Sequence, residues 1–440
     1  MVHFAGLDVH KRVVEACVLD EGGHVVLRDR FPTSRQNLER FASRHLSQED
    51  RVALEATTNT WPIVAILKPF VAEVVISNPL KTRAIAEANV KTDKVDAFVL
   101  AQLLRTNFLP RVWEPDDHTQ LIRRLTSRRS SLVGDRVAVK NRIHSVLHQR
   151  LISCPHDELF SKSGRAWLDA LVLDDEGRRT LDSDLRLLES VGRELTALDD
   201  TLASHAHEDP RTKLLMTIPG VDFTVAQTLI AALGDISRFK SPDSAAAYLG
   251  LTPSTVQSAD HCYHGPITKA GSAHTRWLLV QAAQHIRTNQ GPLGVFYRHL
   301  RARKNHNVAV CAVARKFVVI AWHMLNNNEP YRYAAPRPTE GKLQRLRVRA
   351  THARKKTGPK TGTPPRNSGT PGVPMRTIKP LSQIYAEEGI PPISTPKPGE
   401  LKTVEQAKCK RYVLDLNRTH VVPRNQHIRT PTTRPNQDSQ

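Results

Sequence analysis

The chain has 440 residues and a formal net charge of +21, set by 64 lysines and arginines against 43 aspartates and glutamates. This positive excess indicates polyanionic partners, because counterion release drives basic proteins onto nucleic acids. No apolar run approaches the roughly 20 residues that cross a bilayer, and the segment MVHFAGLDVHKR does not resemble a secretory signal. Five scattered cysteines without a CxxC pair argue against a disulfide framework or a zinc ribbon and indicate a reducing cytoplasm.

Residues 1–115 predict an α/β domain. Three apolar runs, VHFAGLDV, RVVEACVLD and GHVVLRDRF, predict a three-stranded meander. The amphipathic segment SRQNLERFASRHL follows with Ser34 as a candidate helix cap. The segments RVALEA, WPIVAILKPF and AEVVISN then predict a strand, a helix and a strand, and a last helix is expected over Thr92–Arg105. An antiparallel meander followed by α/β alternation is the order of the ribonuclease-H-like fold.

Residues 116–205 predict a helical coiled-coil arm. Apolar positions recur at spacings of three, four and seven, as in a long packed helix, at Leu121, Leu125, Leu132, Val139, Ile143 and Val146. The more acidic segment TLDSDLRLLESVGRELTALDDTLASH is the expected packing partner. Two readings remain open for the basic faces of the first helix, a solvated coiled-coil surface and a nucleic-acid-binding surface. The candidate nucleic-acid contacts are Arg123, Arg124, Arg128 and Arg129.

Residues 206–330 predict a mainly α-helical domain. It opens with LLMTIPGVDFTVAQTLIAALGDISRF, which has the apolar-Pro-Gly-apolar turn of a helix-hairpin-helix element. Backbone amides around Gly220 could then bind a phosphate, whereas the alternative is a plain αα-hairpin. Residues 331–440 are rich in Pro, Gly, Thr, Lys and Arg and predict a basic, largely disordered tail.

Four acidic side chains share one place in the expected fold. Asp8 and Glu55 end neighbouring strands, while Asp93 and Asp96 are three residues apart and project from one helix face. Each acid alone is typical of an ordinary surface residue. Four carboxylates gathered at one place repel one another, and together they predict a bound divalent cation. Mg²⁺ prefers hard oxygen ligands and takes a few carboxylates plus substrate phosphate. The set therefore predicts metal-dependent phosphoryl transfer on nucleic acid, with two ions about 4 Å apart.

The chain resembles a family of bacterial insertion-sequence transposases over about residues 4–325. The family's N-terminal DEDD domain, which is similar to the RuvC Holliday-junction resolvase, resembles GLDVHK, LEAT and NPLKTRAIAEANVKTDKVDAFVLAQLLR. Its C-terminal transposase domain resembles IPGVDFTVAQTLIAALGDISRF, AAAYLGLTPS and GPITKAGSAHTRWLLVQAA. The resemblance implies a cytoplasmic, nucleoid-associated enzyme that binds donor DNA, target DNA and a structured guide RNA. It also implies that Mg²⁺ or Mn²⁺ is held by Asp8, Glu55, Asp93 and Asp96.

A serine nucleophile is also implied by the resemblance. In the family, a serine after the GLTP segment forms a covalent link to DNA, and the matching residue is Ser258, with Ser254 as the alternative. Ala259 follows where the family usually has glycine, and TNTW follows LEAT where the family tends to have a glycine and an aromatic residue. Lys269 and Arg276 are candidate phosphate contacts, against a solvated lysine and a structural arginine.

The sequence therefore leaves three functions open. The first is an RNA-guided DNA transposase that cleaves and exchanges strands with Mg²⁺ and a serine–DNA intermediate. The second keeps the fold but hydrolyses DNA with two metal ions and water, as junction resolvases do. The third is a non-catalytic nucleic-acid-binding protein. Because recombination holds four strand ends and the arm offers an association surface, we expect a homodimer or tetramer.

Overall fold

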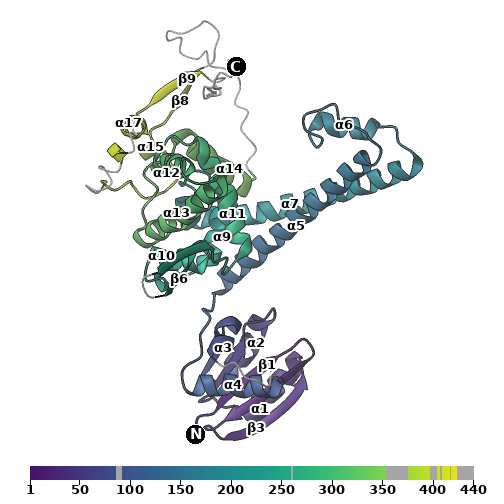
Figure 1. Cartoon of the computed structure of the whole chain (residues 1–440), viewed down its shortest axis with the longest axis vertical. Helices are drawn as coiled ribbons and strands as arrows, with labels where there is room; N and C mark the ends of the chain where they lie inside the picture. Colours follow the sequence, from purple (N-terminus) through teal and green to yellow (C-terminus); the bar gives the residue numbers. More distant parts are fainter. Residues whose placement is uncertain are drawn as a thin grey trace. The chain divides into compact units, whose positions relative to one another are not determined.

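The computed structural model describes residues 1–85, 92–258, 261–352, 375–396, 404–406, 409–416 and 418–423. The chain forms two units, Met1–Asp116 and Asp117–Gln440, each with its own core (Figure 1). The first unit is an α/β domain. The second unit joins the expected arm to the helical region that follows it.

A five-stranded sheet in the order β3-β2-β1-β4-β5 forms the centre of the first unit. The strands β1 to β3 make the antiparallel meander, and β4 and β5 continue the sheet in parallel with β1. Their bounds are β1 Phe4–Val9, β2 Val13–Leu19, β3 Val25–Pro32, β4 Arg51–Glu55 and β5 Glu73–Ser77. This mixed sheet is consistent with the ribonuclease-H-like fold expected from the sequence.

Helices cover both faces of this sheet. Buried side chains of α1 and α2 share one core with β1, and α4 packs on the opposite face against a second set of strand residues. The expected cap at Ser34 forms, because its side chain accepts a hydrogen bond from the Asn37 amide. Thr92, expected as the first residue of the last helix, instead caps it by accepting from the Val95 amide. The bounds are α1 Arg35–His45, α2 Thr60–Leu67, η1 Lys68–Phe70, α3 Pro79–Ile85 and α4 Asp93–Arg105.

The second unit begins with the two long helices of the arm, α5 (Asp117–His148) and α7 (Asp175–Glu208), which lie side by side (Figure 1). The short helix α6 (Lys162–Ala170) lies at the end of the arm and adds Leu168 to its core. The predicted long helix and its acidic partner are thus present. Their shared buried positions are Leu132, Val139, Ile143, Val146, Leu181, Leu185, Val191 and Leu195.

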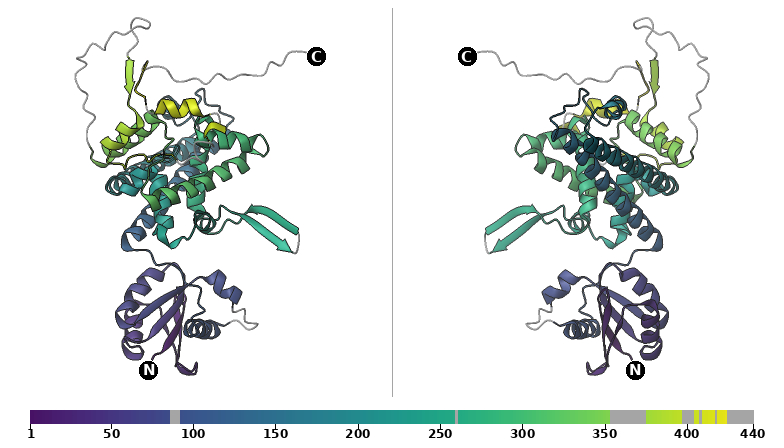
Figure 2. Two further views of the ribbon diagram at one scale, coloured as in Figure 1. Left: turned by 90° about the vertical axis from the view of Figure 1, so that its left-hand side faces the viewer. Right: turned by 90° about the vertical axis from the view of Figure 1, so that its right-hand side faces the viewer.

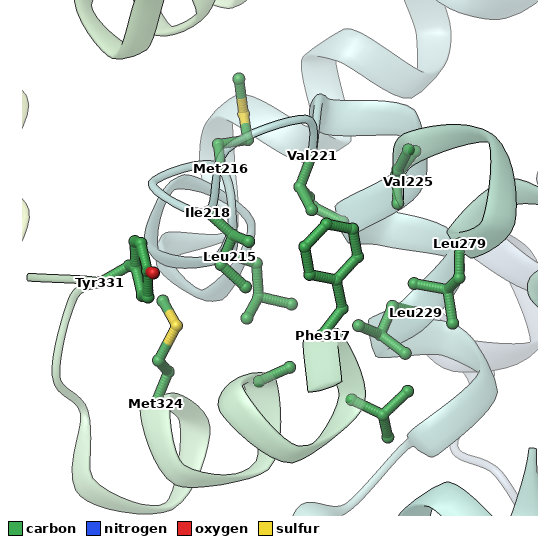
Figure 3. Close-up of a cluster of buried hydrophobic side chains, with 14 of the residues drawn as sticks. Leu215, Met216, Ile218, Val221, Val225, Leu229, Leu279, Phe317, Met324 and Tyr331 are labelled. Atoms are coloured by element: carbon green, nitrogen blue, oxygen red, sulfur yellow. The ribbon is translucent and has the colours of Figure 1, made fainter. Parts of the chain in front are cut away.

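Further helices complete the second unit around one core that includes Phe317 (Figure 3), and a two-stranded β-hairpin is joined to them. Within the described residues, one helix, α13, is long and apolar enough to cross a membrane. Its side chains Val313, Phe317 and Ala321 are fully buried in this core, as in the central helix of a folded domain. The bounds are α8 Pro210–Leu215, α9 Phe223–Leu233, η2 Ile236–Arg238, α10 Pro242–Tyr248, β6 Pro253–Ser258, β7 His261–Ile267, α11 Ala273–Gln284, η3 His285–Thr288, α12 Pro292–Arg301 and α13 His306–Asn327.

The core does not end at residue 330, where the sequence predicts the start of a disordered tail. Buried residues of α14 and α15, including Leu343 and Tyr385, join the core, and the Tyr385 hydroxyl donates to the Tyr331 carbonyl at 2.8 Å. The composition of the whole segment concealed these short apolar stretches, and its Pro- and Gly-rich part, 353–374, lies outside the described residues. The bounds are α14 Pro336–Ala350, β8 Met375–Ile378, α15 Leu381–Glu387, α17 Lys410–Leu416 and β9 His420–Pro423.

Candidate functional site

Two of the predicted acids lie at the ends of neighbouring strands, at one edge of the sheet. Asp8 is the next-to-last residue of β1, and Glu55 is the last residue of β4. The two strands are parallel and Leu7 is paired with Leu54, so the register places Asp8 beside Glu55. Parallel neighbours end at the same edge of a sheet, which is why the sequence could anticipate this placement.

The helix α4 brings the other two acids to this edge. It lies directly on β1 because Gly6 has no side chain: a Cβ there would stand 2.1 Å from the Ala97 carbonyl oxygen and 2.6 Å from the Ala101 nitrogen. Asp93 and Asp96 occupy the first turn of the helix, where carboxylates are favoured by the helix dipole. The glycine therefore sets how closely α4 approaches Asp8.

A histidine that the sequence analysis did not select joins the acids. Nε2 of His10 lies 3.1 Å from Oδ2 of Asp8 and 3.4 Å from Oδ1 of Asp93. One candidate ligand atom from each of the three residues lies within 4.8 Å of the others. The available signal was the spacing in GLDVHK, since residues two apart in an extended chain point to the same side.

The electrostatics of Asp8 are those of a crowded acidic site. Burial is the main cause that raises the pKa of Asp8, the neighbouring His10 opposes it, and the charges of Asp93 and Asp96 raise it further. A divalent cation would offset this repulsion. Several carboxylate oxygens with one imidazole suit a hard ion such as Mg²⁺ or Mn²⁺, so the residues present fit the metal that the sequence predicts.

The predicted nucleophile, Ser258, lies at the end of a β-hairpin. It is the last residue of β6 and is paired with His261 of β7, whereas the sequence suggested a loop; Ala259 lies outside the described residues. The hairpin projects from the helices of the second unit (Figure 2). The alternative, Ser254, donates its hydroxyl to the Pro266 carbonyl at 3.1 Å and so fastens the base of the hairpin.

The four arginines proposed as nucleic-acid contacts divide into two pairs. Arg123 donates from Nε to the Ala231 carbonyl at the end of α9, at 2.7 Å, and Arg129 pairs with Asp199 of α7 at 2.5 Å. Both are therefore engaged in packing the arm. Arg124 and Arg128 are exposed on α5.

The predicted hairpin between helices is present, but its features have structural roles. Gly220 has φ +83°, and a Cβ there would stand 2.5 Å from the Ala282 carbonyl oxygen, so glycine is required by close packing. Asp222 already caps α9 by accepting from the Val225 amide at 2.9 Å. A carboxylate at this helix end disfavours a phosphate there, which supports the plain αα-hairpin reading.

Lys342 lies in the segment expected to be a tail, and its side chain binds the turn around Gly220. Its Nζ donates to the carbonyls of Met216, Ile218 and Val221, with distances of 2.8 Å to Ile218 and 2.9 Å to Val221. Burial lowers the pKa of Lys342 to about 7. The turn therefore depends on a residue more than one hundred positions away.

The two basic residues after the hairpin also differ. Lys269 is exposed and has φ +56°, and its side chain is placed to contact a ligand. Arg276 donates from Nη1 to the carbonyls of Leu249 and Gly271, each at 3.2 Å, and to the Ala270 carbonyl. Burial lowers the pKa of Arg276. The contacts of Arg276 are thus structural. A structural arginine was the alternative to a phosphate contact in the sequence analysis.

Comparisons with known proteins agree with this arrangement. A family model for the DEDD domain of IS110 elements, described as a transposase, matches residues 5–151, and a model described as transposase IS116/IS110/IS902 family matches residues 212–298. The transposase of IS1328 from Yersinia enterocolitica is 26% identical over 73% of this chain and 96% of its own length. The transposase of IS1111A from Coxiella burnetii is 24% identical over 76% and 92%, and a pilin gene-inverting protein from Moraxella bovis is 25% identical over 74% and 97%.

The two family models lie in the expected order and together match more than half of the chain. The first covers the acidic edge of the sheet and all of α5, and the second covers the helical turn, the β-hairpin and α11. A DEDD transposase domain implies a nuclease that depends on a divalent metal, in agreement with the cluster of Asp8, His10 and Asp93. The chain belongs to the IS110/IS116 family of transposases, enzymes that carry out the DNA recombination of insertion sequences.

Proposed function

We propose that this transposase cleaves and exchanges DNA strands with Mg²⁺ or Mn²⁺ through a covalent serine–DNA intermediate, directed by a structured RNA that its element encodes. The meeting of Asp8, Asp93 and His10 at the sheet edge carries the metal-dependent part of this proposal. Glu55 ends the neighbouring strand and Asp96 lies one turn from Asp93, which supports our assignment of both acids to the same site.

The residues of the site have distinct tasks. The carboxylates of Asp8 and Asp93, with those of Glu55 and Asp96, supply hard oxygen ligands, and His10 orients the first two through its ring nitrogen. A divalent ion bound there supplies charge stabilisation to the phosphate oxygens and to the attacking and leaving oxygens. Exposed Lys269, Arg124 and Arg128 would contact the DNA or RNA backbone.

The covalent step is assigned to Ser258. Its Oγ attacks the phosphorus, a new O–P bond forms, the bond from phosphorus to the leaving sugar oxygen breaks, and the serine proton ends on that oxygen. Attack by a sugar hydroxyl of another strand reverses the step and joins new partners, with no external energy source. The position of Ser258 at the end of the projecting hairpin supports this role, since the Ser254 hydroxyl is already hydrogen-bonded within the hairpin.

Trapping the intermediate tests the serine step. The wild-type chain, Ser258→Ala and Ser254→Ala are incubated with end-labelled element DNA, the guide RNA and Mg²⁺, then separated on a denaturing protein gel. We expect labelled protein from the wild type and from Ser254→Ala, and none from Ser258→Ala. Ser258→Ala protein that still becomes labelled contradicts the assignment.

Hydrolysis by metal-activated water is the second candidate. It is favoured by one observation: among the described residues, the cluster of Asp8, His10 and Asp93 lies entirely within the first unit. Cleavage by Ser258→Ala at the wild-type rate, without labelled protein from any variant, would support it. Tight DNA binding without strand breakage by any variant would instead indicate a binding protein.

The guide RNA and the assembly state need separate tests. The chain is expressed with its flanking element DNA, and RNA that survives a high-salt wash is sequenced. We expect one structured RNA from the noncoding end of the element; random RNA released by salt contradicts RNA guidance. We also expect a homodimer or tetramer, so sedimentation as a monomer with RNA and DNA bound contradicts that part.

A further inference from the structure

The short helix α3 is held to the sheet by polar contacts at its start. Asn78 follows β5, and its Oδ1 accepts from the amides of Leu80 at 3.1 Å and Lys81 at 3.2 Å. The buried Thr82 hydroxyl donates to the Asn78 carbonyl at 3.0 Å and is also hydrogen-bonded to Ser77. These bonds fix the first turn without using the apolar side chains of the helix.

The apolar and basic side chains of α3 instead face solvent. Leu80 is 83% exposed and Ile85 is 44% exposed, and Lys81 and Arg83 are exposed beside them. Figure 2 shows α3 standing clear of the strands, on the side of the sheet that α4 covers. A surface that combines an exposed leucine with cations is complementary to nucleic acid, which offers both base faces and phosphates.

This surface begins at the edge that holds the acids. Ser77 is paired with Glu55, and the Ala56 amide donates to the Ser77 carbonyl at 3.0 Å. Neighbouring strands lie about 4.8 Å apart, so the end of β5 is two strands, or roughly 10 Å, from Asp8 on β1. The acids repel phosphate, and the cations of α3 are placed where they can offset that repulsion for a strand entering the site.

We propose that α3 receives the DNA strand to be cut, with Leu80 inserted against an unpaired base and Lys81 contacting a flanking phosphate. Leucine wedges of this kind unstack and kink DNA in other proteins. This inference rests on the proposed strand cleavage at Asp8, because it identifies how the substrate is held beside that site. It commits to DNA, since the acids act on a DNA strand; an RNA occupant is an outcome of the test.

Paired and unpaired DNA probes test the wedge. The full chain is titrated, without divalent metal, with a 30-base-pair duplex and with the same duplex carrying a central unpaired bubble. We expect tighter binding of the bubble, and Leu80→Ser should reduce bubble affinity by roughly 10- to 100-fold, the range for a leucine side chain buried on binding, without changing duplex affinity. Val172→Ser is the matched control, because Val172 is 90% exposed at the arm and has no proposed role.

Two further measurements locate the contact. Hydrogen exchange of Asn78–Ile85 should slow on binding the bubble, and Lys81→Gln should weaken both probes and lower the salt slope by about one. An unchanged bubble affinity in Leu80→Ser, an equal loss in Val172→Ser, or no protection of α3 would overturn the proposal. Stronger protection by single-stranded RNA of the same sequence would overturn the assignment to DNA.

The controls separate this inference from the proposed function. Asp8→Asn should keep the preference for the bubble while losing cleavage, because the wedge does not need the metal. A wild-type chain that prefers the bubble but never cleaves DNA contradicts the proposed function only. A chain that cleaves normally after Leu80→Ser, on paired and unpaired substrates alike, contradicts the role of α3 only.

Discussion

Gly6→Ala is the sharpest test of how the fold builds the acidic site. The added Cβ would stand 2.1 Å from the Ala97 carbonyl oxygen and 2.6 Å from the Ala101 nitrogen, both backbone atoms of α4. Ordinary contact begins at 3.4 Å, so the carbonyl must recede from 2.1 Å to 3.4 Å, a shift of about 1.3 Å. Backbone atoms cannot rotate out of the way, and therefore the helix itself must move away from β1.

The size of the effect follows from this shift. Overpacking of a well-packed core costs about 1–3 kcal/mol, which exceeds the roughly 0.5–1 kcal/mol gained by removing a glycine from a strand. We therefore expect a net loss of stability in the first unit. Because α4 carries Asp93 and Asp96, and a misplacement of about 1 Å can cost 100-fold in rate, metal-dependent cleavage should fall by about that factor.

The assay compares Gly6→Ala with Gly134→Ala and Gly192→Ala. Both control glycines lie within long helices and would place a Cβ with no atom within 4 Å, so we expect them to be stabilised by up to about 1 kcal/mol. Mn²⁺ affinity by electron paramagnetic resonance and cleavage rate are measured for all three. Wild-type metal affinity and rate in Gly6→Ala would refute the reasoning, because α4 would then not set the site.

Two further predictions concern the second unit. Replacing Arg124 and Arg128 with alanine should lower nucleic-acid affinity and reduce the slope of log K against log salt by about 2, with an unchanged melting temperature. Arg129→Ala should lower the melting temperature instead, because it removes one of the two arginines that pair with Asp199. Similar effects of the two sets of substitutions would contradict the division into exposed and packed arginines. Burial lowers the pKa of Lys342 from 10.5 to about 7, so the unfolded chain binds more protons between these values and stability rises with pH there, by up to about 1.4 kcal/mol per pH unit. Lys342→Met should remove this rise in denaturant unfolding from pH 7 to 10, and parallel profiles for the two proteins would contradict it.

Local patterns predicted most of the first unit and the arm. The meander, the cap at Ser34 and the period of the arm depend on neighbours within one or two turns, so the sequence contains them directly. The placement of Asp8 beside Glu55 also followed from topology, since parallel strand ends share an edge of the sheet. The pattern did not identify Gly6 as the residue that lets α4 pack closely on β1.

Long-range packing explains what the sequence analysis missed. Arg123 and Arg124 are adjacent, yet one faces the end of α9 and the other faces solvent, and the period of α5 alone does not say which face meets α9. The ordered part of the C-terminal segment is similar, because Tyr385 and Lys342 are held by partners in the core rather than by their neighbours in sequence.

The most direct test of the central claim joins metal binding to cleavage. The wild type, Asp8→Asn and Asp135→Asn, an exposed acid of α5, are compared for Mn²⁺ affinity and for cleavage of element DNA with its RNA, with and without a chelator. We predict at least a tenfold loss of Mn²⁺ affinity and loss of cleavage in Asp8→Asn alone, and loss of cleavage for every protein in the chelator. Cleavage by Asp8→Asn at the wild-type rate, or cleavage that survives the chelator, would contradict a metal-dependent site at Asp8.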